Sequence, residues 1–472
     1  MMLRKAPRST GLRIRPSSSS TASNSGIDYS SWDPKVVRPY KGQNFFKVLN
    51  SFVVFRLCAI PSFVRWGPTL LETMEKLPGL KQVSHLVVKN TFFSHFCGGE
   101  DIKEVHATMQ NYRKRGLGVI LNYAESAAGM IESVDIAAEH PQNFVAAKLT
   151  PYIPPSILLR WTNSLRTLKS VFDKTARMVV LYSEIDASGK GSFDFIDLTN
   201  VFTIVNHKAR SALLVSSKNS NPALELANEQ DFAIFDAVIP HIESLLSHAH
   251  SKNVKVIIDA EWTYVQPAID DLALHLSKKY NGARRDASQG INGGRPIVFN
   301  TYQMYLKDAL QRVQWEIERA SRGGYNVGVK IVRGAYIVSE SQRAQEMGYE
   351  NPICPSLEAT HKSFNSAIDL CIGEIKKETP DPTASTPLPV QFFIASHNKE
   401  SVLHAWLTLK DLKLDPQSDC GYKCVPYGSV EVTIPYLVRR AQENSAVLGG
   451  VAVDKKNLWD EIVMRLGRST TA

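Results

Sequence analysis

Short apolar runs recur along this 472-residue chain, and each ends abruptly in polar residues. The runs are rich in β-branched and aromatic residues, a helical pattern follows each of them, and they occupy residues 118–125, 144–150, 254–261, 297–303, 329–336 and 392–398. A continuous apolar run of this length is typical of a strand that is buried on both faces, as strands are in parallel sheets. The alternation of strand and helix therefore predicts an α/β fold built on a parallel sheet.

The polar ends of these runs indicate where chemistry is expected. In a barrel of parallel strands, the carboxyl ends of all strands meet at one mouth, which is where active sites of this architecture form. The residues expected to converge there are Glu125, Lys148, Asp259, Glu261, Gln303, Arg333 and His397. Any one of them could be an ordinary strand-end residue, but the whole set favours a functional site.

A second cluster of charge lies at residues 436–443, in a segment with helical character. Arg439 and Glu443 are four residues apart, which places them on one helix face. Tyr436 precedes Arg440 by the same interval and can share that face. A guanidinium group is permanently charged and binds a carboxylate through two hydrogen bonds. The segment therefore predicts a site for a small carboxylate, and the alternative is a solvated ion-pair face.

Several separate stretches of the chain together resemble proline dehydrogenase, a family of flavoenzymes with a distorted (β/α)8 barrel. The resemblance extends from about Asn90 to Gly449 and rests on residues 91–93, 96–99, 258–261, 299–308, 329–336, 358–360, 395–398, 425–428 and 436–440. It implies a TIM-type α/β barrel with an N-terminal helical arm. The corresponding domains are the arm at 27–115, the barrel at 116–460 and a C-terminal tail at 461–472.

The resemblance implies that FAD lies across the strand ends. The positions that line the flavin in the family correspond here to Asn300, Gln303, Lys330, Arg333, Gly334, Ala335 and His397. The substrate carboxylate would be held by Arg439, Arg440 and Lys148. Glu443 and Asp259 would orient this cationic cluster as further members of the catalytic site, and no metal site is expected.

The activity implied by the resemblance is the FAD-dependent oxidation of L-proline to 1-pyrroline-5-carboxylate, the first step of proline catabolism, with electrons passed to a membrane quinone. No Gly-x-Gly-x-x-Gly segment occurs, which disfavours a nicotinamide-binding Rossmann domain. Cys424 stands where the family usually has a tyrosine that packs on the substrate ring. Because the smaller side chain leaves room on that ring, hydroxyproline is an alternative substrate.

A second departure from the family follows Asn398. From there to residue 421 the chain has room for one helix, at 401–412, and a loop, whereas the family has a further strand and helix. The barrel is therefore expected to lack one strand-helix unit, with a break before a strand near Tyr422. Two other functions stay open, namely an aldolase-like barrel that forms a Schiff base on Lys148, and an inactive barrel that acts as a binding protein.

The N-terminal composition indicates a cellular location. Residues 1–26 contain five basic residues, a run of serines at 17–20 and no acidic residue, which is typical of a mitochondrial presequence, although a disordered basic tail is the alternative. Removal of these five charges lowers the formal net charge from +9 to +4, so no nucleic-acid partner is implied. The expected location is the mitochondrial matrix or the matrix face of the inner membrane, where peripheral association fits a quinone acceptor.

Two further segments have an informative composition or spacing. Residues 45–64 are strongly apolar but include Lys47 and Arg56, so they predict either packing on the barrel or contact with a membrane surface rather than a membrane span. Residues 186–197, within a helical insert near 164–200, follow the spacing of an EF-hand loop. Lys190 replaces a usual ligand, so a loop that does not bind calcium is expected. Six scattered cysteines without a Cys-x-x-Cys pair argue against a disulfide framework.

Overall fold

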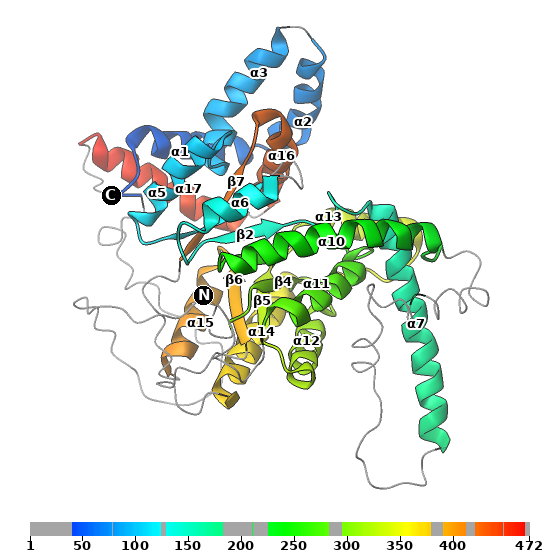
Figure 1. Ribbon diagram of the computed structural model, residues 1–472. Helices are drawn as coiled ribbons and strands as arrows, with labels where there is room; N and C mark the ends of the chain where they lie inside the picture. The colour runs from blue at the N-terminus through cyan, green and yellow to red at the C-terminus, as the bar shows by residue number, and fades with distance from the viewer. Residues whose placement is uncertain are drawn as a thin grey trace. The chain divides into compact units, whose positions relative to one another are not determined.

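The computed structural model describes residues 40–77, 79–123, 129–182, 210, 225–282, 295–378, 390–411, 421–446 and 448–467 (Figure 1). These residues belong to two compact units. The first unit comprises residues 119–396 and 404–411, and the second comprises residues 40–118, 397–403 and the described residues from 421 onward. Each unit is described by itself.

Some predicted features lie outside the described residues. These are the presequence at 1–26 and the EF-hand-like segment at 186–197. Both stay predictions, as do the predicted domain boundaries.

In the described part of the chain, seven strands form one sheet, and they include all six apolar runs that the sequence predicts as strands. The strands are β1 (Gly118–Tyr123), β2 (Phe144–Ala147), β3 (Lys255–Ile258), β4 (Val298–Gln303), β5 (Val327–Val332), β6 (Val390–Ala395) and β7 (Tyr422–Tyr427). Their order in the sheet is β6-β5-β4-β3-β2-β1-β7. The prediction of an α/β fold is confirmed.

The register of the sheet aligns the strand ends. Strands β1 to β6 pair in parallel. Ala147 of β2 lies beside Ile258 of β3, and Gln303 of β4 lies beside Val332 of β5. In the same way, Val332 pairs with Ala395 of β6. The residues that follow these strands therefore emerge at one edge of the sheet.

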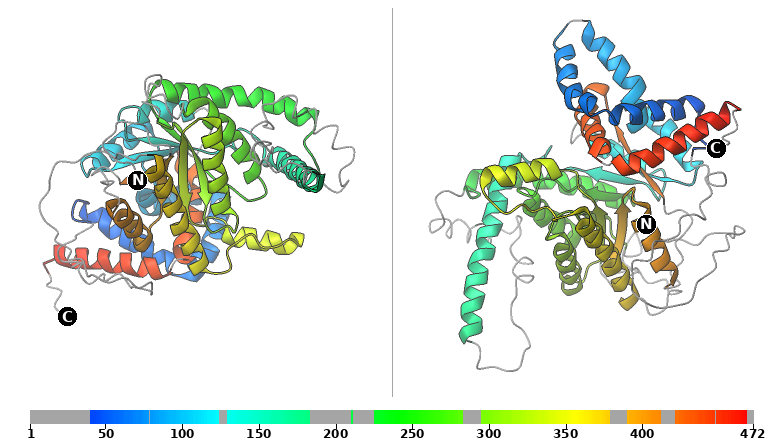
Figure 2. Two further views of the ribbon diagram at one scale, coloured as in Figure 1. Left: turned by 90° about the horizontal axis from the view of Figure 1, so that it is seen from below. Right: turned by 180° about the vertical axis from the view of Figure 1, so that it is seen from behind.

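Helices alternate with the strands, as the sequence predicts (Figures 1 and 2). They are α6 (Gly129–Ala137), α7 (Pro155–Tyr182), α10 (Glu229–Ser251), α11 (Gln266–Tyr280), α12 (Ala309–Gly323), α13 (Ile337–Met347), α14 (Leu357–Glu378) and α15 (Lys399–Asp411). The helix predicted at residues 401–412 corresponds to α15.

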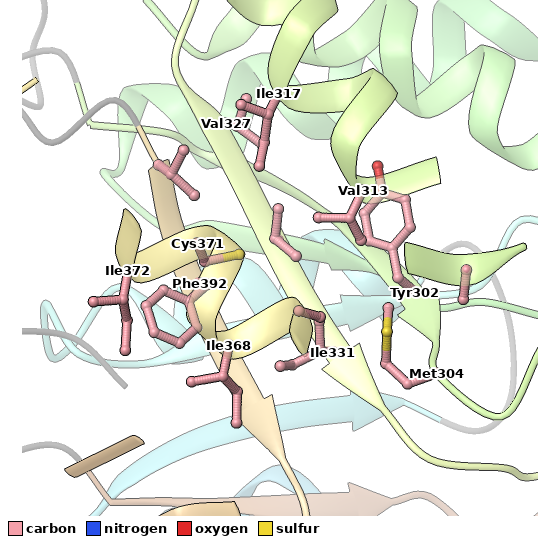
Figure 3. Packing of buried hydrophobic residues seen from close by; sticks show 14 of the residues in the cluster. Tyr302, Met304, Val313, Ile317, Val327, Ile331, Ile368, Cys371, Ile372 and Phe392 are labelled. Carbon is pink, nitrogen blue, oxygen red and sulfur yellow. The ribbon is translucent and has the colours of Figure 1, made fainter. Parts of the chain in front are cut away.

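Helices α12 and α14 bury their apolar faces against strands β4 to β6 (Figure 3). Val313 and Ile317 of α12 are spaced four residues apart, as are Phe364 and Ile368 of α14, and all four are at most 6% exposed. This spacing places each pair on one helix face. Since burial of one such side chain contributes roughly 1.5–3 kcal/mol, this layer fixes the strands that carry the candidate site.

Local sequence determines where several helices begin and end. The Asn228 side chain accepts a hydrogen bond from the Asp231 N–H at 3.1 Å, and the Asp231 carboxylate accepts one from the Asn228 N–H at 3.2 Å, which starts α10 with a reciprocal cap. Arg160 Nε of α7 donates to the same carboxylate at 2.8 Å. Helices α12 and α13 are terminated by the glycines that directly follow them, Gly324 and Gly348, whose φ angles of 71° and 68° lie in the left-handed region that favours glycine.

The second unit joins the N-terminal helices to the C-terminal ones. It contains α1 (Phe45–Cys58), α2 (Pro61–Glu75), α3 (Leu80–Val88), the π-helix η2 (Lys89–Phe93), α4 (Ser94–Phe96), α5 (Ile102–Arg113), β7, α16 (Val430–Ala446) and α17 (Leu448–Arg465). Val48 of α1 packs with Leu458 and Ile462 of α17. Arg465 Nη1 donates to the Gln43 carbonyl oxygen at 2.8 Å, so the last turn of α17 is held to the residues that precede α1.

The apolar segment at residues 45–64 is divided between α1 and α2, which are bent by 97° to one another. No single helix in the described ranges is long and apolar enough to cross a membrane, although the bent pair together has the length and composition for it. Helix α1 packs against α16 and α17. By contrast, Trp66 and Leu70 of α2 are 62% and 58% exposed.

The test of the break expected after Asn398 depends on residues 412–420, so the lack of one strand-helix unit stays a prediction. Strands β6 and β7 are the two end strands of the sheet, and no described strand lies between them in sequence. Residues 412–420 lie outside the description. The described sheet thus has seven strands where an intact barrel of this type has eight.

Gly328 of β5 offers a test of how tightly the sheet is packed. A methyl group there would lie 2.4 Å from the Val298 carbonyl oxygen, so Gly328→Ala should lower the free energy of unfolding by roughly 1–3 kcal/mol. The matched control is Gly373→Ala in α14, where nothing lies within 4 Å of the added methyl group and alanine favours the helix by roughly 1 kcal/mol. Urea unfolding measures both, and equal stabilities of the two variants would contradict the packing argument.

Candidate functional site

Four strand ends of the first unit carry residues predicted for the site. Lys148 follows β2, Asp259 follows β3, and Gln303 ends β4. Lys330 lies within β5, and Arg333 directly follows that strand. The parallel register brings these ends to one edge of the sheet, as the sequence predicts. A sixth predicted member, Glu125, lies outside the described residues.

An ion pair joins the ends of β3 and β5. Lys330 Nζ is 2.7 Å from Asp259 Oδ1, and the two side chains are 14% and 17% exposed. The Asp259 N–H donates to the Ala147 carbonyl oxygen at 2.9 Å, which ties this residue to β2 as well. Because a charge that is largely withdrawn from water needs an opposite charge nearby, Asp259 stabilises the Lys330 ammonium group at this edge.

Glu261 lies two residues beyond Asp259 and is only 3% exposed. The Thr150 hydroxyl contacts both of its carboxylate oxygens, at 2.9 and 3.0 Å. Burial raises the pKa of this carboxyl, whereas the Thr150 hydrogen bonds and the nearby Lys148 act to lower it. The sequence predicts Glu261 among the residues at the mouth of the barrel, and the structure buries its side chain, whose oxygens accept from Thr150 in the loop after β2.

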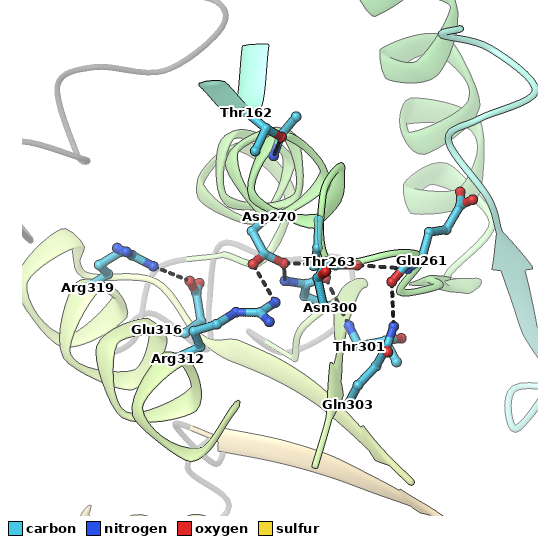
Figure 4. Close-up of polar contacts among 12 residues, drawn as sticks. Thr162, Glu261, Thr263, Asp270, Asn300, Thr301, Gln303, Arg312, Glu316 and Arg319 are labelled. Atoms are coloured by element: carbon cyan, nitrogen blue, oxygen red, sulfur yellow. Dashed lines mark hydrogen bonds and ion pairs between the residues drawn. The ribbon is translucent and has the colours of Figure 1, made fainter. Parts of the chain in front are cut away.

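Asn300 and Gln303 are 5% and 2% exposed, and both are hydrogen-bonded to protein groups (Figure 4). Asn300 Nδ2 donates to Asp270 Oδ1 at 3.0 Å, and Arg312 Nη2 binds the other oxygen of that carboxylate at 2.5 Å. Gln303 Nε2 donates to the Glu261 carbonyl oxygen at 2.7 Å. The two amides therefore hold the strand ends in place, and their contact with FAD stays a prediction.

Arg333 contacts three side chains that the sequence does not single out for the site, those of Ser396, His361 and Phe364. Its Nη1 donates to the Ser396 hydroxyl, and its Nη2 is 3.3 Å from His361 Nδ1. Its guanidinium carbon lies 4.1 Å from the centre of the Phe364 ring, a stacking contact that orients the cation. Arg333, His361 and Ser396 together offer cationic and hydroxyl donors to an anion such as a phosphate.

Gly334 and Ala335 form the loop that follows Arg333. A methyl group on Gly334 would lie 2.7 Å from the Ile337 side chain and 3.0 Å from the Tyr305 ring. A side chain at this position would therefore require Ile337 to move, because the loop packs closely against Ile337 and Tyr305.

The second unit carries the other predicted residues. Residues 436–443 lie in α16, as predicted. Arg439 and Arg440 are partly buried, and the guanidinium carbon of Arg440 lies 5.3 Å from the centre of the Tyr436 ring. The side chain of Glu443 lies outside the described structure, so its action on the arginines stays a prediction.

His397 also belongs to the second unit. His397 is exposed, yet desolvation by neighbouring protein atoms lowers the pKa of its imidazole, and the positive charges of Lys423 and Arg440 lower it further. Asp454 acts in the opposite direction. The net shift favours the neutral imidazole at neutral pH.

A partly buried histidine in the second unit was not identified from the sequence. His95 Nδ1 is 2.9 Å from Ser51 Oγ, and its ring packs edge-on against Phe96 with 4.5 Å between ring centres. Burial, together with the nearby Lys423, lowers the pKa of His95 to about 4. His95 is therefore neutral in the folded protein at neutral pH.

The described cysteines are free thiols, namely Cys58, Cys97, Cys354, Cys371 and Cys424. Burial raises the pKa of Cys58 to about 11 and that of Cys97 and Cys371 to about 12, so these three are protonated and poor nucleophiles. Within the described ranges, no group of three or more His, Cys, Asp or Glu side chains is placed to hold a metal ion.

Comparison with known proteins adds to these observations. A family model described as proline dehydrogenase matches residues 105–422. Proline dehydrogenase 1, mitochondrial, of Dictyostelium discoideum is 31% identical over 447 residues, which cover 86% of this chain and 70% of the relative. The human protein of the same name is 26% identical over 550 residues, covering 90% and 88%. Hydroxyproline dehydrogenase of Bos taurus is 28% identical over 453 residues, covering 89% and 90%.

A solved structure shares the fold. Proline utilization A (PutA) from Bdellovibrio bacteriovorus superposes with a TM-score of 0.52 at 13% identity, over 90% of this chain. The chain spans 40% of the length of that PutA chain. At this identity the likeness concerns the fold alone, and it agrees with the distorted TIM-type barrel expected from the sequence.

The lowered pKa of His95 predicts a pH-dependent stability. The unfolded chain binds a proton at this residue below a pKa of roughly 6.5, but the folded protein does so only near 4, so stability is lost as the pH falls between these values. The wild type should lose about 1–2 kcal/mol more than His95→Gln between pH 7 and pH 5, because the other groups titrate alike in both. Urea unfolding at each pH measures this, and parallel pH profiles would contradict the assignment.

Proposed function

The chain belongs to the proline dehydrogenase family and is a proline-oxidising oxidoreductase, and we propose that it converts L-proline to 1-pyrroline-5-carboxylate with FAD as the hydride acceptor. The observation that carries the proposal is the ion pair between Lys330 and Asp259, at the edge of the sheet where the family resemblance expects the flavin. The pair places the Lys330 ammonium group, balanced by the Asp259 carboxylate, where neighbouring parallel strands end.

The residues at this edge fit FAD. Arg333, His361 and Ser396 offer donors to phosphate oxygens, and Lys330 offers a cation to the polar edge of a flavin. Asn300, Gln303, Gly334, Ala335 and His397 complete the set of residues that the family resemblance assigns to the cofactor. When bound, FAD supplies the acceptor for a hydride and thus for two electrons.

The protein side chains bind and orient the substrate. In this proposal, Arg439 and Arg440 bind the carboxylate of proline. Lys148 adds a third positive charge for the same carboxylate. Asp259 and Glu443 balance these cations and hold their orientation. Oxidation removes a hydride from the ring carbon next to nitrogen and a proton from the nitrogen, which leaves a carbon–nitrogen double bond. Fixing the carboxylate at one end of a small rigid ring determines where that carbon lies.

A membrane quinone is the proposed electron acceptor, and the proposed location is the mitochondrial matrix or the matrix face of the inner membrane. The names of the Dictyostelium and human relatives support the mitochondrial location. Exposed apolar side chains of the second unit support a peripheral contact with the membrane, among them Phe46 (75%), Trp66 (62%) and Leu86 (63%).

Hydroxyproline is the alternative substrate. Cys424 is exposed and smaller than the tyrosine usual in the family, and a hydroxyproline dehydrogenase is among the relatives at 28% identity. The ratio of kcat/KM for hydroxyproline and proline, measured side by side, distinguishes the two activities.

The visible spectrum of the purified protein tests the cofactor. Protein purified with added FAD should show flavin absorption bands, and acid or heat should release free FAD, because no covalent link is expected. Proline should bleach the bands as the flavin is reduced. A colourless protein that borohydride traps on its substrate would instead support the Schiff-base enzyme on Lys148, and a colourless protein without turnover would support the inactive barrel.

Removal of either arginine tests the carboxylate site. Loss of one partner from a desolvated charge pair costs roughly 2–5 kcal/mol, so Arg439→Met and Arg440→Met should each raise the KM for proline at least roughly 30-fold with flavin content unchanged. Lys456→Met, which removes an exposed positive charge from α17, is the control and should leave the KM unchanged. Unaltered kinetics in both arginine variants would show that residues 436–443 form only a surface ion-pair face.

A further inference from the structure

The loop after β3 and the first turn of α13, the helix that follows β5, are joined by a pair of short hydrogen bonds that the proposed chemistry does not use. Glu340 Oε1 accepts from the Thr263 backbone N–H at 2.6 Å, and Glu340 Oε2 accepts from the Thr263 hydroxyl at 2.5 Å. Glu340 is 1% exposed. A buried carboxylate that uses both oxygens on a single partner residue forms a specific contact, since charge-assisted hydrogen bonds are short and strong. This contact is called the latch below.

Both sides of the latch are anchored to the fold. The Glu340 N–H donates to the Tyr336 carbonyl oxygen at 2.9 Å in the first turn of α13, so the carboxylate is fixed relative to Tyr336. Arg166 Nη2 of α7 donates to the Thr263 carbonyl oxygen at 3.3 Å. The positive charge of Arg166 also interacts with Glu340, which offsets part of the cost of burying that carboxylate.

Each side of the latch carries an aromatic ring, and the two rings are in contact. Trp262 precedes Thr263, and its ring centre is 5.0 Å from that of Tyr336, with 41° between the planes. The Trp262 ring also stacks on that of Tyr264, with 6.0 Å between ring centres and 18° between the planes. All three aromatic residues are only partly buried, so the group forms an apolar surface at this edge.

The aromatic surface lies next to the candidate site along both strands. Trp262 follows Glu261, and Tyr336 follows the loop of Gly334 and Ala335. The buried Tyr305 packs against this loop, since its ring would be only 3.0 Å from a methyl group on Gly334. The loop that precedes Tyr336 is therefore packed on a buried residue, and the position of Trp262 depends on how the loop after β3 is held.

We propose that Thr263 and Glu340 are positioning residues that hold Trp262 against Tyr336, and that the two rings form the apolar wall for the hydrocarbon ring of the substrate. The inference rests on the proposed function, because it assigns a substrate contact within the same site. The latch acts through Trp262 and touches no reacting atom. A five-membered ring is small and apolar, and a fixed aromatic face excludes water from it and limits its orientations.

The holoenzyme with substitutions at Thr263 provides the first test. Thr263→Val removes the hydroxyl bond at nearly constant volume, whereas Thr263→Ser keeps both bonds. Thr263→Val should raise the KM for proline about tenfold, the lower end of the effect of one lost hydrogen bond to a charged group, with a smaller change in kcat and unchanged flavin content. Thr263→Ser should restore the wild-type KM. The control is Thr408→Val in α15, whose hydroxyl bonds within its own helix to the His404 carbonyl oxygen at 2.8 Å.

A double-mutant cycle tests whether the latch acts through Trp262. Trp262→Leu should raise the KM by itself, and Thr263→Val should add nothing in that background, because the ring that the latch positions is gone. Additive effects of the two substitutions would overturn the proposal. A loss of thermal stability in Thr263→Val with an unchanged KM would overturn it as well.

A measurement that needs no substrate separates this inference from the proposed function. The near-ultraviolet circular dichroism of the wild type minus that of Trp262→Phe reports the fixed contact of Trp262 with its aromatic neighbours. Thr263→Val should lose that difference signal and Thr263→Ser should keep it. If proline does not reduce the wild-type flavin, the proposed function fails, and the dichroism alone decides the latch. If turnover is normal but Thr263→Val keeps the signal, the latch is refuted.

Discussion

The parallel register of strands β2 to β6 brings the ends of these strands to one edge of the sheet. Several positively charged side chains meet there, and nearby carboxylates of the first unit balance their charges. Lys148, Lys330 and Arg333 would repel one another if they were left alone at such an edge. Asp259 binds Lys330 at 2.7 Å, and Glu261 lies near Lys148. The strand ends therefore form a compensated cluster of charges, which can be partly buried and still present cations to a ligand.

The loops beyond these strands are held by buried hydrogen-bond acceptors rather than by apolar packing alone. Asp270 accepts from Asn300 and Arg312, and the Glu261 backbone is held by Gln303. Since a buried polar group without a partner costs roughly 1–3 kcal/mol, each of these contacts makes the alternative loop positions unfavourable. The outcome is a rigid edge, which suits a reaction that depends on the position of one ring carbon.

The second unit is held together by contacts between its first and last helices. Its first and last helices are joined by the packing of Val48 on Leu458 and by Arg465, whose guanidinium group binds backbone carbonyl oxygens near residue 43. The unit contains α16 with its arginine pair and, in α1 to α3, many exposed apolar side chains. Segments from both ends of the chain are thus required to build it, so a truncation at either end is expected to affect the helix that carries Arg439 and Arg440.

The sequence by itself determined the strands, the helices between them and the helical octapeptide at 436–443, because apolar periodicity and strand-end chemistry are local properties of the chain. The pairing of Lys330 with Asp259, and the burial of Gln303 and Glu261, were decided only by the tertiary structure. The same is true of Arg333 with His361, and of Thr263 with Glu340. These partners lie on different strands and helices, and no local pattern encodes a contact that the register of the sheet and the packing of helices bring about.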